Sequence, residues 1–189
     1  MIVLLDNGHG RDTAGKRSPV WSDGRQLFEW ETNRKIVQKI ASNLTRKGIP
    51  YKILVPEDYD VSLSERCRRA NAIRNGYVFS VHCNAGGGTG FEVWTSKGET
   101  KSDKLATIVF EEAQNELREF KMRTDYVDGD ADFENQFTIL AKTKCPAVLG
   151  ESLFMDNARD CEFLMSDEGL RRIASMYTKA IVRIYEKYK

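Results

Sequence analysis

The sequence predicts a single α/β domain built around a largely parallel sheet. Short apolar segments flanked by turn residues alternate along the chain with longer segments of helical periodicity. The length of 189 residues suffices for one domain with a substantial core and is too short for two ordinary domains. No linker, repeat or low-complexity tract divides the sequence. We therefore expect residues 1–189 to form one domain.

The elements follow from local patterns. Strands are predicted at 2–6, 51–55, 77–82, 90–95 and 146–150, with a weaker candidate at 137–141. Helices are predicted at 29–47, 62–75, 102–120 and 167–187. The last helix carries an apolar stripe typical of a helix packed on a sheet, formed by Leu170, Ile173, Ala174, Tyr177, Ile181, Ile184 and Tyr188. Two long loops remain, at 7–28 and 121–136; the first has the length of a functional loop, and we interpret the second as a solvated acidic loop.

Composition excludes several classes of protein. The net charge of +1 does not favour nucleic acid or a membrane surface as the main partner. No apolar run approaches the length that crosses a bilayer. The four cysteines show no spacing typical of a disulfide framework or a metal site, so we expect four reduced thiols. Met1 leads directly into a predicted strand, and we expect no signal peptide in this sequence.

The two histidines of the chain both follow apolar strands. His9 lies in "IVLLDNGHG" and His82 in "YVFSVHCNAGGG". Ligands of open α/β sheets bind beyond the carboxyl ends of the strands, so parallel pairing would bring these imidazoles together. Two histidines at that edge could begin a catalytic zinc site, which takes three protein ligands. The alternative is a pair of unrelated loop histidines.

Helix geometry selects between two candidates for the third ligand. The buried stripe of the first helix leads back by turns to Glu29, whereas Glu31 falls on the solvent face with Lys35. An inward carboxylate needs a positive partner, which could be zinc or an arginine. A fourth polar residue, Glu151, follows the buried segment 147–149 at the same sheet edge. Beside a zinc ion it could serve as general base and acid; alternatively, a lysine or a backbone amide could hold it.

These residues belong to an ordered series of blocks that resembles a known family. The series runs from His-Gly after the first strand and Glu at the first helix start through "SLSER", "SVHCNA", "GFEVW" and "FTILAKTKCPAVLGE". In this order it closely resembles the zinc-dependent N-acetylmuramoyl-L-alanine amidases of the amidase-3 family. The resemblance implies a mixed six-stranded sheet with helices on both sides. It also implies one zinc ion on His9, Glu29 and His82, with Glu151 as the catalytic glutamate and peptidoglycan as the substrate.

The sequence departs from the family in the loops around the predicted cleft. Asn7 stands where the family usually has proline, and "GRDTAGKRSPVW" replaces a Gly-rich run. The segment 152–157 after the catalytic glutamate also differs. No predicted metal ligand is affected, but substrate preference is. The candidate substrate-binding residues are Lys16, Arg17, Trp21 and Asn84; for the three loop residues, ordinary anchoring of the loop is the alternative.

Three other functions compete with this interpretation. The first is a zinc peptidase or another zinc amidohydrolase, and the second is a non-catalytic wall-binding module. The third, a phosphate-binding domain using "NAGGGTG", is disfavoured because that loop leads into a predicted strand rather than a helix. Peptidoglycan lies outside the cytoplasmic membrane, so we expect either a phage-type lysin released through a membrane lesion or a protein whose export signal has been removed.

Overall fold

The computed structural model describes residues 1–127 and 129–189, and these form a mixed six-stranded sheet with the order β2-β1-β3-β6-β4-β5. The strands are β1 (Ile2–Asn7), β2 (Tyr51–Ile53), β3 (Gly76–Asn84), β4 (Phe91–Thr95), β5 (Phe133–Glu134) and β6 (Ala147–Phe154). The first three pair in parallel, and β6 pairs in parallel with β3. Only the β6–β4 pairing is antiparallel, with β5 parallel to β4. The prediction of a mostly parallel sheet is confirmed.

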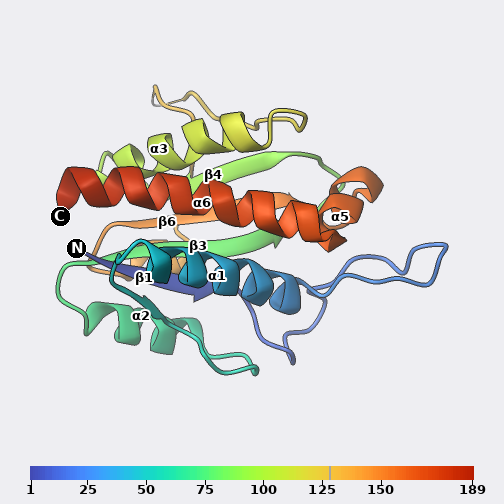
Figure 1. Ribbon diagram of the computed structural model, residues 1–189, viewed down its shortest axis with the longest axis horizontal. Coiled ribbons are helices and arrows are strands. Elements are labelled where there is room, and N and C mark those ends of the chain that lie inside the picture. The colour runs from blue at the N-terminus through green and yellow to red at the C-terminus, as the bar shows by residue number, and fades with distance from the viewer. Residues whose placement is uncertain (128) are drawn as a thin grey trace.

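Helices cover both faces of this sheet. They are α1 (Glu29–Arg46), α2 (Leu63–Asn71), α3 (Lys101–Glu116), α4 (Thr138–Ala141), α5 (Ala158–Met165) and α6 (Asp167–Tyr188). On one face α6 lies between α1 and α3 and packs against both, while α2 lies on the opposite side of the sheet together with α4 (Figure 1). None of the described helices has the length and apolar character needed to cross a bilayer.

The strands divide the core into two apolar layers. Leu5, Phe79 and Val148 belong to the larger layer, beneath α1, α3 and α6. Their chain neighbours Leu4, Val78 and Leu149 belong to the smaller layer, beneath α2 and α4. This division follows from the alternation of side chains along a strand. The four cysteines are free thiols, as expected.

The weak strand predicted at 137–141 is wrong, because this segment forms helix α4. Ile139 and Leu140 are both buried in the smaller layer, and adjacent strand residues would point to opposite faces. The sixth strand is instead the two-residue β5, which lies within the loop predicted at 121–136 and pairs with Trp94 and Thr95. That loop also contains Asp128, which lies outside the described residues.

Helix α5 was not predicted, although the sequence carries a signal for it. The side chain of Asn157 accepts hydrogen bonds from the backbone N–H groups of Arg159 and Asp160, as a helix N-cap does. Helix α2 also has an N-cap, since the side chain of Ser62 accepts a hydrogen bond from the backbone N–H of Glu65 at 3.3 Å. Helix α2 ends at Asn71 and α3 at Glu116, each four residues before the predicted end.

Candidate metal centre and active site

The candidate site lies at the carboxyl edge of the parallel strands. Strands β1 and β3 run side by side in register, with Asn7 opposite Val81. His9 follows β1 by two residues, and His82 lies near the end of β3. The next strand, β6, places Glu151 opposite His82. The parallel pairing on which the histidine argument depended is therefore present.

His9 occupies an unusual turn. Its φ of 65° lies in the left-handed region, which L-residues with side chains rarely adopt. The neighbouring glycines are required by space: a Cβ atom on Gly8 would lie 2.1 Å from the ring of His82. On Gly10 it would lie 2.0 Å from the backbone nitrogen of Asp60. The two glycines thus leave room for His82 and Asp60 to approach the backbone, whereas His9 itself adopts the left-handed conformation of the turn.

Helix α1 presents Glu29 to this turn. Glu29 is its first residue and is only 1% exposed, whereas the side chain of Glu31 is 46% exposed and pairs with Lys35. The inward orientation predicted for Glu29 from the helix stripe is what the structure shows. The chain enters the helix through an extended Phe28, without a side-chain cap.

One oxygen of Glu29 lies between the two histidines. Its Oε1 atom is 3.1 Å from Nδ1 of His82 and 3.3 Å from Nε2 of His9. The two imidazole rings are perpendicular, with centroids 5.0 Å apart. Burial opposes ionisation of Glu29, but hydrogen bonds from His82 and His9 outweigh it and hold its pKa well below the usual value. Burial likewise opposes protonation of His82, and the carboxylate of Glu29 nevertheless raises its pKa.

The donor chemistry of this cluster fits a divalent metal ion. The ligand atoms of His9, Glu29 and His82 all lie within 4.8 Å of one another, the one such convergence among the described residues. The second oxygen of Glu29, Oε2, is buried and has no hydrogen-bond partner. Two imidazole nitrogens and a carboxylate are a common ligand set of catalytic zinc. A cation here would satisfy an oxygen that the protein leaves unpaired.

Glu151 adjoins this cluster from the neighbouring strand. Its pKa is raised to about 7: burial is the main cause, Glu29 and Glu92 add to the shift, and His82 and Lys16 oppose it. Its Oε2 atom is buried and unpaired. Neither a lysine nor a backbone amide is hydrogen-bonded to that oxygen in the part of the chain that the structure describes. A carboxyl group with a pKa near neutrality can both accept and donate a proton at working pH.

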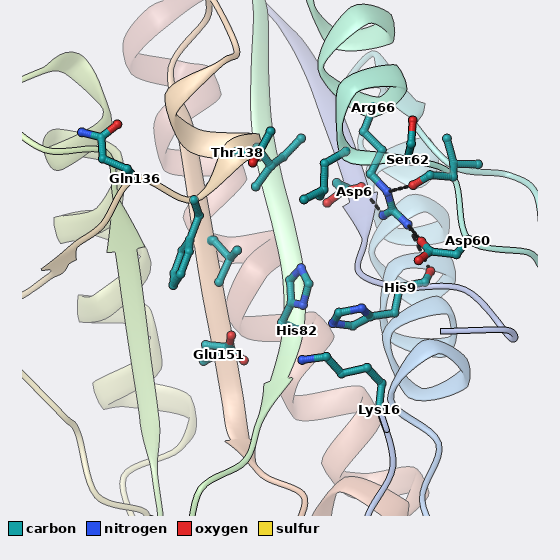
Figure 2. Close-up of a pocket in the computed structure, with 15 residues that line it drawn as sticks. Asp6, His9, Lys16, Asp60, Ser62, Arg66, His82, Gln136, Thr138 and Glu151 are labelled. Carbon is teal, nitrogen blue, oxygen red and sulfur yellow. Dashed lines mark hydrogen bonds and ion pairs between the residues drawn. The ribbon is translucent and has the colours of Figure 1, made fainter. Parts of the chain in front are cut away.

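These groups open into a pocket of about 440 Å³. Figure 2 shows Lys16 reaching across its floor toward Glu151, with His9 and His82 between them and Arg66. Apart from these residues, the pocket is lined by Asp6, Asp60, Val61, Ser62, Leu63, Gln136, Phe137, Thr138, Ile139 and Leu149. One wall therefore comes from the start of α2 and another from the start of α4.

Of the four predicted substrate-binding residues, the structure brings only Lys16 to the pocket. Arg17 forms a backbone bridge with Phe28. Trp21 packs against the larger core layer, and its indole N–H donates to Sγ of Cys161 at 3.2 Å. Asn84 donates to Glu92 at 2.6 Å.

Arg66 and Asp6 form a buried ion pair at the pocket wall, with a 2.8 Å contact, that was not predicted from the sequence. A signal for Arg66 existed. The helix periodicity places it on the same face of α2 as Cys67 and Ala70, which are small or apolar, so this arginine could have been predicted to be buried.

Comparison with known proteins places this geometry in a family. The family model for N-acetylmuramoyl-L-alanine amidase (Amidase_3) matches residues 3–183. The chain is 30% identical to an endolysin of Bacillus phage SPP1 over 188 residues, which are 97% of this chain and 65% of that protein. It is 28% identical to the N-acetylmuramoyl-L-alanine amidase CwlM of Bacillus licheniformis, covering 99% of this chain and 70% of that protein. The chain thus spans about two thirds of the length of these relatives.

Solved structures share the fold. An N-acetylmuramoyl-L-alanine amidase from Clostridium difficile 630 superposes with a TM-score of 0.85 at 23% identity, covering 100% of this chain and 98% of that one. The amidase AmiC2 of Nostoc punctiforme gives 0.83 at 22% identity, covering 98% and 97%. With its six-stranded sheet and a family model matching nearly every residue, the chain belongs to the Amidase_3 family of N-acetylmuramoyl-L-alanine amidases.

Proposed function

We propose that this chain hydrolyses the amide bond between the lactyl group of N-acetylmuramic acid and L-alanine of the peptidoglycan stem. The observation that carries the proposal is the convergence of His9, Glu29 and His82 beside Glu151 in a member of this family, with both histidines and Glu151 lining one pocket. In this proposal the three convergent residues hold one zinc ion. When bound, zinc would lower the pKa of water toward about 7 and polarise the scissile carbonyl.

Glu151 performs the proton transfers. It accepts a proton from the attacking water, whose oxygen forms a bond to the lactyl carbonyl carbon. It then donates that proton to the alanine nitrogen as the carbon–nitrogen bond breaks. The products are a lactyl carboxylate and a free α-amino group on L-alanine. Burial raises the pKa of this carboxyl group and so favours the protonated form that the second step requires.

Lys16 supplies a positive charge for substrate binding. It lines the pocket and lies close enough to Glu151 to lower the pKa of that carboxyl group. Arg66, the other cation in the pocket wall, is instead paired with Asp6 and Asp60. Lys16 is therefore the cation available to a carboxylate or carbonyl of the muropeptide.

Product analysis tests the proposed reaction. Purified peptidoglycan is digested with the zinc-loaded protein, and the products are identified by mass spectrometry and amino-group labelling. We expect new amino groups on L-alanine, with the stem peptide intact. Cleavage within the stem would instead assign a zinc peptidase. Binding to the wall without turnover would assign a non-catalytic module.

The site of action follows from the substrate. Peptidoglycan lies outside the cytoplasmic membrane, and one relative is a phage endolysin. We propose that this chain acts on the cell wall in the same manner as a lysin.

A further inference from the structure

Arg66 is fully committed to protein contacts. It is 1% exposed and lies on α2 facing the carboxyl edge of the sheet. Its five N–H groups donate to five oxygen atoms, namely Val61 O at 2.8 Å, Asp6 Oδ1 at 2.8 Å, Asn7 O at 3.0 Å, Asp60 Oδ1 at 3.1 Å and His9 O at 3.2 Å. A guanidinium group has five such donors, so none remains for a substrate. Arg66 therefore lines the pocket without being free to bind there.

A second guanidinium group reaches the same backbone carbonyl. Nη1 of Arg34, on α1, donates to the His9 oxygen at 3.1 Å. Its Nη2 donates to the carbonyl of Glu57. The guanidinium groups of two helices, α1 and α2, thus donate hydrogen bonds to the same backbone carbonyl, that of His9.

Arg66 also connects the two strands that carry the histidines. The Asp6 carboxylate, which it contacts through Oδ1, accepts a hydrogen bond at Oδ2 from Ser80 on β3, at 2.5 Å. Ser80 precedes His82 by two residues on that strand. One buried network therefore ties the end of β1 to the segment of β3 just before the second histidine.

We infer that Arg66 and Arg34 are positioning residues for the metal centre, acting through the His9 carbonyl. The left-handed conformation of a non-glycine residue is unfavourable and persists only where surrounding contacts impose it. The two guanidinium groups are those contacts. They fix the direction in which the imidazole of His9 leaves the backbone, and hence its distance from Glu29. This inference rests on the proposed metal site.

Zinc affinity is the direct test, because it requires no substrate. The dissociation constant is measured by competition with a chromogenic chelator for wild type, Arg66→Lys and Arg34→Gln. Arg66→Lys keeps a positive charge for Asp6 but cannot span the backbone carbonyls. We expect it to weaken zinc binding about 10–100-fold, the usual scale for residues that orient metal ligands. We expect a loss of about tenfold for Arg34→Gln, which leaves Arg66 in place.

Arg69→Lys is the matched control. Arg69 lies on the same helix and also combines carboxylate contacts, to Glu57 and Glu65, with a backbone carbonyl, that of Leu54. It does not contact the His9 turn. Its variant should bind zinc as wild type does, whatever it loses in the melting temperature of the metal-free protein.

The outcomes separate this inference from the proposed function. Wild-type zinc affinity in both Arg66→Lys and Arg34→Gln would overturn the positioning role. If Arg66→Lys fails to fold, the affinity of Arg34→Gln alone decides. A wild-type protein that binds no zinc would instead overturn the proposed function itself.

Discussion

Glu29 and His9 reach the same point by different structural means. Glu29 is presented by the first turn of a long helix, where its backbone is rigid. His9 reaches it from a short left-handed turn that flanking glycines and arginines maintain. The helix backbone places Glu29, and the backbone N–H of Cys83 on β3 donates to its carboxylate at 3.2 Å, whereas the turn depends on arginines from two helices.

The two acidic residues of the first α1 turn should behave differently when replaced. Glu29→Ala removes a carboxylate that bridges both histidines, and we expect zinc content to fall well below one equivalent, with loss of activity. Glu31→Ala removes only an exposed pair with Lys35 and should change stability by about 0.5 kcal/mol. Metal analysis and urea unfolding measure both effects. Metal loss in Glu31→Ala with retention in Glu29→Ala would contradict the ligand assignment.

Glu151→Gln separates metal binding from chemistry. The variant keeps the size of the side chain but cannot accept a proton. We expect zinc content close to wild type and a decrease in kcat of about 10²–10⁴-fold, with a smaller change in KM. Steady-state kinetics on soluble muropeptides and metal analysis test this. Turnover near wild type would place the base elsewhere, and loss of zinc would make Glu151 a ligand.

Asp132 should make stability depend on pH. It is 3% exposed and accepts a hydrogen bond from Thr95. Its pKa is raised to about 8, mainly by burial, with a further contribution from Asp130 and Asp103 included in that value. The unfolded chain releases this proton near pH 4 and the folded chain near pH 8. This group therefore lowers the free energy of unfolding as pH rises through that window, by at most about 1.4 kcal/mol per unit, and not beyond it.

Asp132→Asn mimics the protonated form and should remove this slope. We expect the variant to match wild type near pH 4 and to exceed it in stability at pH 8. Urea unfolding across this range measures the difference. If the difference in the free energy of unfolding between Asp132→Asn and wild type does not change with pH, titration of Asp132 is excluded as its cause.

At the scale of elements, the packing of α6 on β6 depends on one glycine. A Cβ atom on Gly150 would lie 2.0 Å from Oη of Tyr177, whose ring is fully buried. We expect Gly150→Ala to destabilise the protein by about 1–3 kcal/mol, as overpacking does. Tyr177→Phe removes the clashing oxygen, so the cost of the alanine should be smaller in that background. Chemical unfolding of wild type, the two single variants and the double variant gives the coupling energy, and strict additivity would contradict the contact.

Elements with a long periodic pattern were predictable from the sequence, whereas three short elements, β5, α4 and α5, were not. The stripe from Leu170 to Ile184 identified α6 because a 22-residue helix repeats its pattern several times. Strand β5 has two residues, and its pairing with β4 is decided by tertiary contacts. The four residues of α4 form too short an apolar run to distinguish a helix from a strand.

The candidate site shows the same limit. The convergence of His9, His82 and Glu151 was predictable because strand ends in a parallel sheet share one edge. The inward orientation of Glu29 was predictable because the periodicity of a helix identifies its buried face. Trp21 and Asn84 do not line the pocket, because their polar groups bond to Cys161, which is distant in sequence, and to Glu92 on the neighbouring strand β4. Such partners follow from tertiary packing rather than from local pattern.

At the scale of the whole molecule, metal binding should stabilise the fold. The three proposed ligands come from the turn after β1, from α1 and from β3, so a bound ion links separate elements. A ligand that binds only the folded state at 1,000 times its Kd adds about 4 kcal/mol to the free energy of unfolding. We therefore expect zinc to raise Tm and a chelator to reverse the change, measured by differential scanning fluorimetry. His82→Ala should show no such rise; an equal rise would indicate zinc binding elsewhere.

The position of β6 in the sheet bears on how the protein is made. This strand begins at Ala147, yet it lies between β3 and β4, which are complete by Thr95. During synthesis on the ribosome, β3 and β4 are therefore complete before β6, the strand that pairs with both, emerges about 50 residues later. Glu151 arrives on that strand, and α6 closes the larger core layer only afterwards. Because Glu151 emerges with β6 and non-local pairing of this kind is slow, the candidate site lacks its proposed general base until the last quarter of the chain has folded.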